Sequence, residues 1–200
     1  MVKECAMSGR PKIFDDGEVL SKAAEVFWRQ GYEATSTEDL LAAMGIGKGS
    51  FYLAFKGGKK ELYEKALGQH SDQAIAQFRR ELDAAEDPVE YIREFFRRIA
   101  HSTKTRHQKG CIFGNAVAEL SNVENPMMKR AATHLQGLEG LFLDALLRGK
   151  QKGTLHSKLE PALLARLLLN NWNGLGITRR IYPDNEALSE LIETQLKILG

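Results

Sequence analysis

The stretch from Ser36 to Phe55 constrains the fold of this chain more than any other segment. It contains two short segments with helical spacing, separated by Gly45. At the start of the first segment, Ser36 and Thr37 offer side-chain oxygens that can cap free backbone N–H groups. The apolar residues that follow at helical spacing are Leu40, Leu41 and Met44. This pattern predicts one short amphipathic helix.

The second segment begins with small residues. Gly45 can take a left-handed conformation at no steric cost and end the first helix. Residues 47–50, Gly-Lys-Gly-Ser, then open a second helix whose Phe51 and Phe55 face inward. Two helices joined this tightly, with small and cationic residues opening the second, predict a helix-turn-helix.

The start of the second helix has the chemistry of a DNA-reading surface. Its small residues let the backbone approach the wall of a major groove, and Lys48, Ser50 and Tyr52 can hydrogen-bond base edges or phosphates. The only charged residues between positions 40 and 60 are four lysines, which suit a polyphosphate partner. The alternative for these residues alone is a structural helical hairpin with lysines in solvent.

The order of residues 31–67, GYEATSTEDLLAAMGIGKGSFYLAFKGGKKELYEKAL, resembles the N-terminal domain of the tetracycline-repressor (TetR) family of transcription regulators. The resemblance runs from about residue 14 to residue 67. It includes the Thr-Ser cap, the Gly-Ile corner, the KGSFY helix and the FKGGKKEL entry to a long helix. It implies that the following residues face DNA: Ser36, Thr37, Gly47, Lys48, Gly49, Ser50, Tyr52, Lys56 and Lys59.

Hydrophobic periodicity predicts an all-α chain of about nine helices, with an N-terminal three-helix unit that contains the helix-turn-helix. Residues 1–60 are predicted to form the DNA-binding domain, with a mobile arm at 1–12, and residues 61–200 an effector-binding and dimerisation domain. A helix over 59–85 would run roughly 35 to 40 Å and connect the two. The aromatic residues expected to pack beneath the helix-turn-helix are Phe14, Phe27 and Trp28.

The second domain carries aromatic residues that are candidates for a ligand pocket, with core packing as the alternative role of each. They are Phe78, Tyr91, Phe95, Phe113, Phe142 and Trp172. The segment 110–120, GCIFGNAVAEL, is similar to one in the ligand-binding domain of many TetR-like regulators. The two final helices, 161–177 and 183–199, are apolar over a wide arc. The resemblance implies that they form a four-helix bundle with a second subunit, which sets two recognition helices about 34 Å apart.

A basic run follows the fifth predicted helix, and it is interpreted either as a source of extra phosphate contacts or as a solvated loop. Its members are Arg97, Arg98, Lys104, Arg106 and Lys109. The two cysteines, Cys5 and Cys111, form no C-x-x-C pair, which argues against a zinc site and a disulfide scaffold. Cys111 is interpreted as a buried small hydrophobe rather than a redox switch.

The 200 residues are 43% hydrophobic and 27% charged, as in a globular protein. No apolar run has the length of a signal peptide or membrane helix, so a cytoplasmic location without membrane contact is expected. No motif of an enzyme, metal site or cofactor site is found, and none of the three is expected.

The function predicted from the sequence is that of a dimeric repressor bound to a palindromic double-stranded DNA operator. A small-molecule effector would release it. The alternative is a helical protein-interaction scaffold without specific DNA binding.

Overall fold

The computed structural model describes residues 15–120 and 126–200, which form ten α-helices, a closing 3-10 turn and no strand. The predicted arm 1–12, Cys5 and Phe14 lie outside these residues. The helices are α1 (Asp16–Gln30), α2 (Thr37–Met44), α3 (Lys48–Ala54), α4 (Gly58–Ala84), α5 (Pro88–Ala100), α6 (Lys104–Lys109), α7 (Ile112–Glu119), α8 (Pro126–Lys152), α9 (Pro161–Ile181) and α10 (Asn185–Leu196). The all-α prediction is confirmed. The addition to the nine predicted helices is α6, which lies in the basic run, where a solvated loop was one of the two interpretations.

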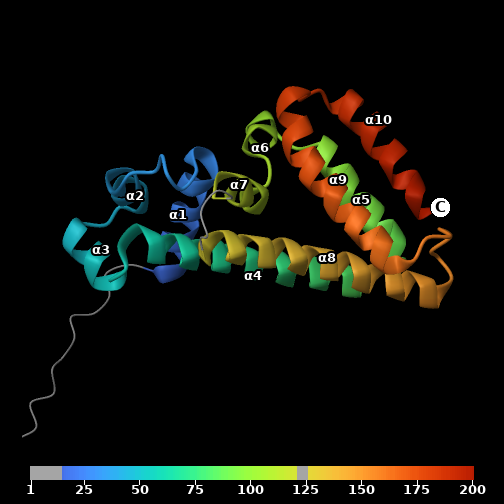
Figure 1. The fold of residues 1–200 in the computed structure, drawn as a ribbon, viewed down its shortest axis with the longest axis horizontal. Coiled ribbons are helices and arrows are strands. Elements are labelled where there is room, and N and C mark those ends of the chain that lie inside the picture. Colours follow the sequence, from blue (N-terminus) through green and yellow to red (C-terminus); the bar gives the residue numbers. More distant parts are fainter. Residues whose placement is uncertain (1–14, 121–125) are drawn as a thin grey trace, which may run out of the picture.

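Local capping explains the helix-turn-helix. Ser36 Oγ accepts a hydrogen bond from the Asp39 backbone N–H at 3.1 Å, and the Asp39 carboxylate accepts one from the Ser36 N–H at 3.1 Å. This reciprocal pair fixes the start of α2. Gly45 ends α2 in the left-handed conformation, with φ +70°. The predicted helix-turn-helix is therefore present, with α2 and α3 at one end of the molecule (Figure 1).

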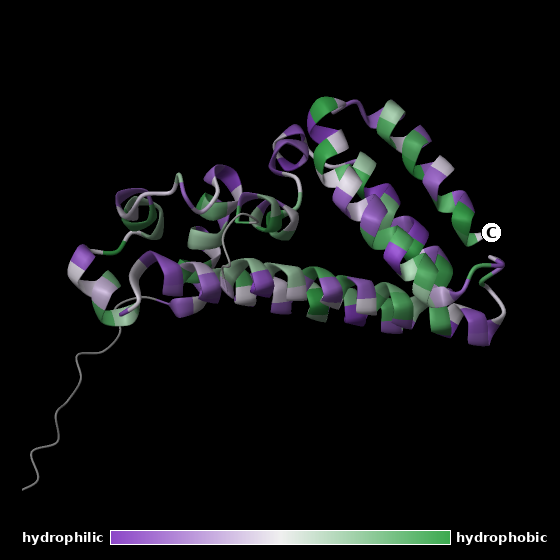
Figure 2. Cartoon of the chain, viewed as in Figure 1, coloured by the Kyte–Doolittle hydropathy of each residue, from purple (hydrophilic) through white to green (hydrophobic). Residues whose placement is uncertain are grey.

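The two longest helices, α4 and α8, run side by side and in the same direction along the molecule (Figure 1). Ion pairs join them near both ends, Arg130 to Glu64 at 2.8 Å and Arg148 to Asp83 at 2.6 Å. Figure 2 shows hydrophilic and hydrophobic residues alternating along both helices, as amphipathic helices require. The helix α4 therefore extends from the helix-turn-helix to the region where α8 ends.

The buried side chains form two clusters. The first joins α1, α2, α3 and the start of α4 to α7 and the start of α8, because Ile112, Ala116 and Ala131 pack within it. The second joins the end of α4 to α5, the end of α8, α9 and α10. A domain boundary at residue 60 stays a prediction, and the first hydrophobic cluster extends across that boundary.

Candidate DNA-binding face and ligand cavity

The helix α3 has one buried and one exposed face. Phe51 is fully buried and Phe55 is 4% exposed, so both anchor α3 against the core as predicted. On the opposite face Lys48 is exposed, Tyr52 is 47% exposed and Leu53 is 77% exposed. Lys48 and Tyr52, at i and i+4, share one side of the helix, and Leu53 extends the exposed surface around it. The outward surface formed by these three side chains is here called the α3 face.

Two glycines at the start of α3 have open space around them. A Cβ atom built on Gly47 or Gly49 would meet nothing within 4 Å. Gly47 also gives α3 no side-chain cap. Packing within the protein therefore does not require glycine at either position, and a slim helix start leaves room for an external surface to approach.

The other predicted DNA-facing residues differ in their surroundings. Ser36, Thr37, Ser50 and Lys56 all retain some exposure at this end of the molecule. Lys59 is half-buried, and its Nζ donates hydrogen bonds to the carbonyl oxygens of Tyr32 and Thr35 at 2.9 and 3.0 Å. The structure therefore gives Lys59 a bracing role between α4 and the turn that follows α1. The DNA contacts of all these residues stay predictions.

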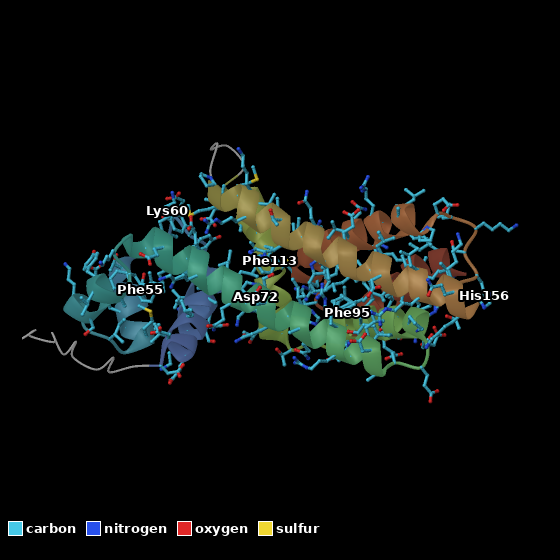
Figure 3. All side chains as sticks on the ribbon, turned by 90° about the horizontal axis from the view of Figure 1, so that it is seen from below. Phe55, Lys60, Asp72, Phe95, Phe113 and His156 are labelled. Atoms are coloured by element: carbon cyan, nitrogen blue, oxygen red, sulfur yellow. The ribbon has the colours of Figure 1, made fainter. Side chains whose placement is uncertain are left out.

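A cavity of about 300 Å³ lies in the middle of the molecule, with walls from α1 and from α4 through α9. Figure 3 shows Phe95 and Phe113 there, between Phe55 at one end and His156 at the other. The predicted pocket residues that line the cavity are Phe78, Tyr91, Phe95, Phe113 and Trp172. Phe142 is not among the lining residues. It is fully buried, with its ring 5.9 Å from Phe78 and 5.7 Å from Phe95, because the core of the second cluster encloses it.

Trp28 also lines this cavity. It is 8% exposed and packs with the first cluster, as predicted, but its ring lies 5.3 Å from His70 on α4. Since α1 belongs to the same cluster as α2 and α3, a molecule in the cavity would lie against the core that supports the DNA-binding face.

The polar part of the cavity wall was not predicted from the sequence. Burial lowers the pKa of His70 and of His134, so both are neutral near pH 7. The Cys111 Sγ accepts hydrogen bonds from Trp172 Nε1 at 3.3 Å and from the Gly114 N–H at 3.4 Å. No local spacing in the sequence marks these residues, because they come from different helices. Cys111 is buried, as expected.

The basic run is largely occupied by contacts within the protein. Arg97 pairs with Glu90, Glu94 and Glu193, the last at 2.6 Å. Arg98 pairs with Glu81 on α4. Arg106 lies over the Trp28 ring, and Lys109 pairs with Glu25. These contacts favour a structural role over phosphate binding for this run.

The helix α7 connects the cavity wall to the DNA-binding end. Phe113 near its start lines the cavity. At its end, the Glu119 carboxylate accepts hydrogen bonds from the Tyr32 N–H at 3.0 Å and the Glu33 N–H at 2.8 Å. Lys59 holds the same turn from α4. The turn between α1 and α2 is therefore held by two helices that also border the cavity.

Together, the helix-turn-helix, its outward α3 face and the cavity beyond it are typical of a DNA-binding protein with a second, helical domain. Comparison with known proteins agrees. Residues 19–66 match the model of the bacterial regulatory proteins of the tetR family, and residues 88–194 match the tetracyclin repressor-like C-terminal domain. The chain belongs to the TetR family and is a DNA-binding transcriptional regulator.

Relatives with known names support this assignment. The chain is 29% identical to the HTH-type transcriptional repressor ComR of Escherichia coli (strain K12), over 95% of this chain and 91% of ComR. It is 26% identical to the HTH-type transcriptional repressor DhaR of Mycobacterium sp. (strain GP1), over 90% of each. These relatives are regulators rather than enzymes.

A solved structure has the same fold. It is a cysteine mutant of the TetR family transcriptional regulator CifR in complex with 26-base-pair operator DNA. Its TM-score is 0.81 at 27% identity, with 96% of this chain and 100% of that chain covered. Among residues 15–120 and 126–200 of the present chain, none of the helices combines the length and the apolar character that a membrane-spanning helix needs. The same residues contain no cluster of side chains arranged to hold a metal ion.

Proposed function

We propose that the protein is a dimeric repressor whose α3 face reads a palindromic operator and whose cavity binds a small-molecule effector that releases the DNA. The observation that carries this proposal is the α3 face, where Lys48 and Tyr52 point outward while Phe51 anchors the helix. The operator complex of CifR and the repressor names of ComR and DhaR support it.

The proposed DNA contacts divide by chemistry. Lys48 and Lys56 suit phosphates or guanine edges, and the Tyr52 hydroxyl suits a phosphate or base edge. Leu53, which was not among the predicted DNA contacts, is 77% exposed and suits a thymine methyl group. We propose the remaining predicted residues as supporting contacts.

Double replacement of Lys48 and Tyr52 by alanine tests the DNA contacts. The ligand is a genomic DNA fragment selected by its binding to the unchanged protein. We expect the affinity of the double variant for this fragment to be about 10- to 100-fold lower, because hydrogen bonds and a phosphate contact are lost. The slope of log affinity against log salt should become shallower by about one for the lost lysine contact. Fluorescence anisotropy at several salt concentrations measures both.

Lys22→Ala is the matched control, because Lys22 lies on α1 and pairs with Glu18 at 2.7 Å. This variant should bind DNA as the unchanged protein does. If the double variant also retained full affinity, α3 would not read DNA, and the scaffold alternative would gain support.

The proposed dimer interface lies on the last two helices. Exposed positions on α9 are spaced seven, four, three and four residues apart and so follow one side of that helix. They are Leu163, Asn170, Gly174, Ile177 and Ile181. Ile177 and Ile181 are each 63% exposed. Neighbouring large apolar side chains with this exposure favour a surface that a second subunit covers.

Ile177→Lys is expected to weaken dimerisation at least about tenfold, because a charge would be buried in an apolar interface. Analytical ultracentrifugation over a concentration series measures the change. Leu53→Lys is the control, since it also replaces an exposed apolar residue by lysine but lies on α3, apart from α9 (Figure 1). A dimer unaffected by Ile177→Lys would place the interface elsewhere.

The proposed release mechanism uses the contacts around the turn between α1 and α2. An effector in the cavity would displace α7 or α4, and Glu119 and Lys59 would carry this movement to the turn. The effector then prefers the conformation with lower DNA affinity. By linkage, DNA weakens effector binding by the same factor.

A further inference from the structure

Arg179 on α9 is a buried cation in the cavity wall. Its side chain lines the cavity, the residue is only 5% exposed, and its Nε has no hydrogen-bond partner in the described structure. No carboxylate among the described residues forms an ion pair with it. A buried guanidinium without a counter-charge is unfavourable, because it loses the solvation that water provides. The described part of the protein therefore supplies no negative charge to neutralise this guanidinium.

A second guanidinium lies in the same wall. Arg106 on α6 also lines the cavity, and its guanidinium carbon lies 4.3 Å from the centre of the Trp28 ring. The acidic residue near it, Glu25, forms its ion pair with Lys109, although its charge also acts on Arg106 and opposes the lowering of the Arg106 pKa by burial. Burial, and after it the positive charge of Arg106, lower the pKa of Arg179 to about 10. The two arginines thus repel each other across a region with no paired anion.

The rest of the wall differs from this region. The third cavity arginine, Arg98, is neutralised by Glu81 at 2.9 Å, and the Tyr91 hydroxyl also donates to Glu81. The two cavity histidines are neutral because burial lowers the pKa of each. The excess positive charge is therefore confined to Arg106 and Arg179.

Beside these two arginines, the wall is aromatic. The rings of Phe95 and Trp172 are stacked with centres 5.3 Å apart, and Phe113 packs 4.8 Å from His134. Such surfaces bind flat apolar groups. The cavity of about 300 Å³ is at the small end of ligand pockets, which suits a molecule of one or two rings.

We infer that the cavity binds a small aromatic carboxylate, with the carboxylate at Arg106 and Arg179 and the rings against Phe95, Phe113 and Trp172. This inference rests on the proposed function, in which the occupant of the cavity is the effector. A carboxylate at this place would attract the guanidinium of Arg106, which lies against Trp28 of α1. Ligand charge would thus act on the helix that supports α2 and α3.

Isothermal titration calorimetry with 1-naphthoate and its neutral analogue 1-naphthamide tests the inference. The two probes have the same rings and differ in charge. We expect the full-length protein to bind naphthoate at least tenfold more tightly, because the charged hydrogen bonds are made only by the acid. Arg179→Met should reduce naphthoate affinity at least tenfold and leave naphthamide affinity unchanged.

Arg166→Met is the matched control, because Arg166 lies on the same helix and its side chain is 77% exposed. It should leave both affinities unchanged. Thermal melting by circular dichroism shows whether Arg179→Met folds, and loss of an unpaired buried charge should keep its Tm equal to or above that of the unchanged protein. Arg106→Met provides a second variant at the same site.

Equal affinity for acid and amide, absence of naphthoate binding at millimolar concentration, or naphthoate binding that does not depend on either arginine would overturn the inference. A DNA titration with and without naphthoate separates it from the proposed function. Tight naphthoate binding through Arg179 with unchanged DNA affinity would support the ligand class and contradict the effector role of the cavity.

Discussion

Replacing Gly110 by alanine is expected to lower the free energy of unfolding by about 3 kcal/mol or more. Gly110 joins α6 to α7 with φ +65° and ψ −143°, a conformation that is almost restricted to glycine. A Cβ atom there would lie 2.5 Å from the backbone oxygen of Gly176 on α9. A backbone oxygen cannot rotate away as a side chain can, so α6 and α9 would have to separate.

Gly153→Ala is the matched control for this prediction. Gly153 also has a positive φ, +74°, but a Cβ atom there would meet nothing within 4 Å. Gly153→Ala should therefore lower the free energy of unfolding by only about 1 kcal/mol, which is the cost of placing alanine in a left-handed conformation. Urea denaturation followed by circular dichroism measures both variants. Equal losses would show that the close approach of α6 to α9 does not contribute to stability.

The parts of the fold that were predictable from the sequence depend on neighbouring residues. The capping pair of Ser36 and Asp39, the left-handed Gly45 and the apolar spacing of α3 act within one or two turns. The local pattern therefore predicted the helix-turn-helix and its buried phenylalanines correctly. The short helix α6 was missed because its sequence, KTRHQK, has no apolar stripe.

The cavity was predicted only in its aromatic part. Aromatic residues at inward positions are visible in a helical pattern, and five of the six candidates line the cavity. The sixth, Phe142, shows the limit of this reasoning, because periodicity identifies an inward face but not whether that face meets a void or other side chains. The absence of an ion pair at Arg179 could not be predicted, because it depends on which side chains helices far apart in sequence bring next to it.

The two hydrophobic clusters give a physical basis for communication between cavity and DNA. Residues of α7 and early α8 pack with the helix-turn-helix, although they lie more than fifty positions beyond it in sequence. The cavity lies where the two clusters meet, since Trp28 belongs to the first and Phe78 to the second. A ligand there contacts both cores at once and can favour one relative placement of them.

Phe51→Ala is expected to lower the free energy of unfolding by about 3 to 5 kcal/mol, because a fully buried ring is removed and a cavity is left. Phe51 packs against Phe55 and Tyr52, with ring centres 5.6 and 5.0 Å away. The variant should also lose DNA binding, since α3 would no longer be held in place. Leu53→Ala is the control on the same helix and should change stability by less than about 0.5 kcal/mol.

The shape of the Phe51→Ala unfolding curve distinguishes two kinds of domain organisation. If residues 1–60 fold independently, an early transition should appear that leaves α7 protected from hydrogen exchange. If the first cluster is the cooperative unit, the amides of α7 should lose protection together with those of α1 to α3, because Ile112 and Ala116 pack in the same core. We expect the second result. Hydrogen exchange resolved by mass spectrometry measures it, and protection of α7 after α3 has opened would support the boundary at residue 60.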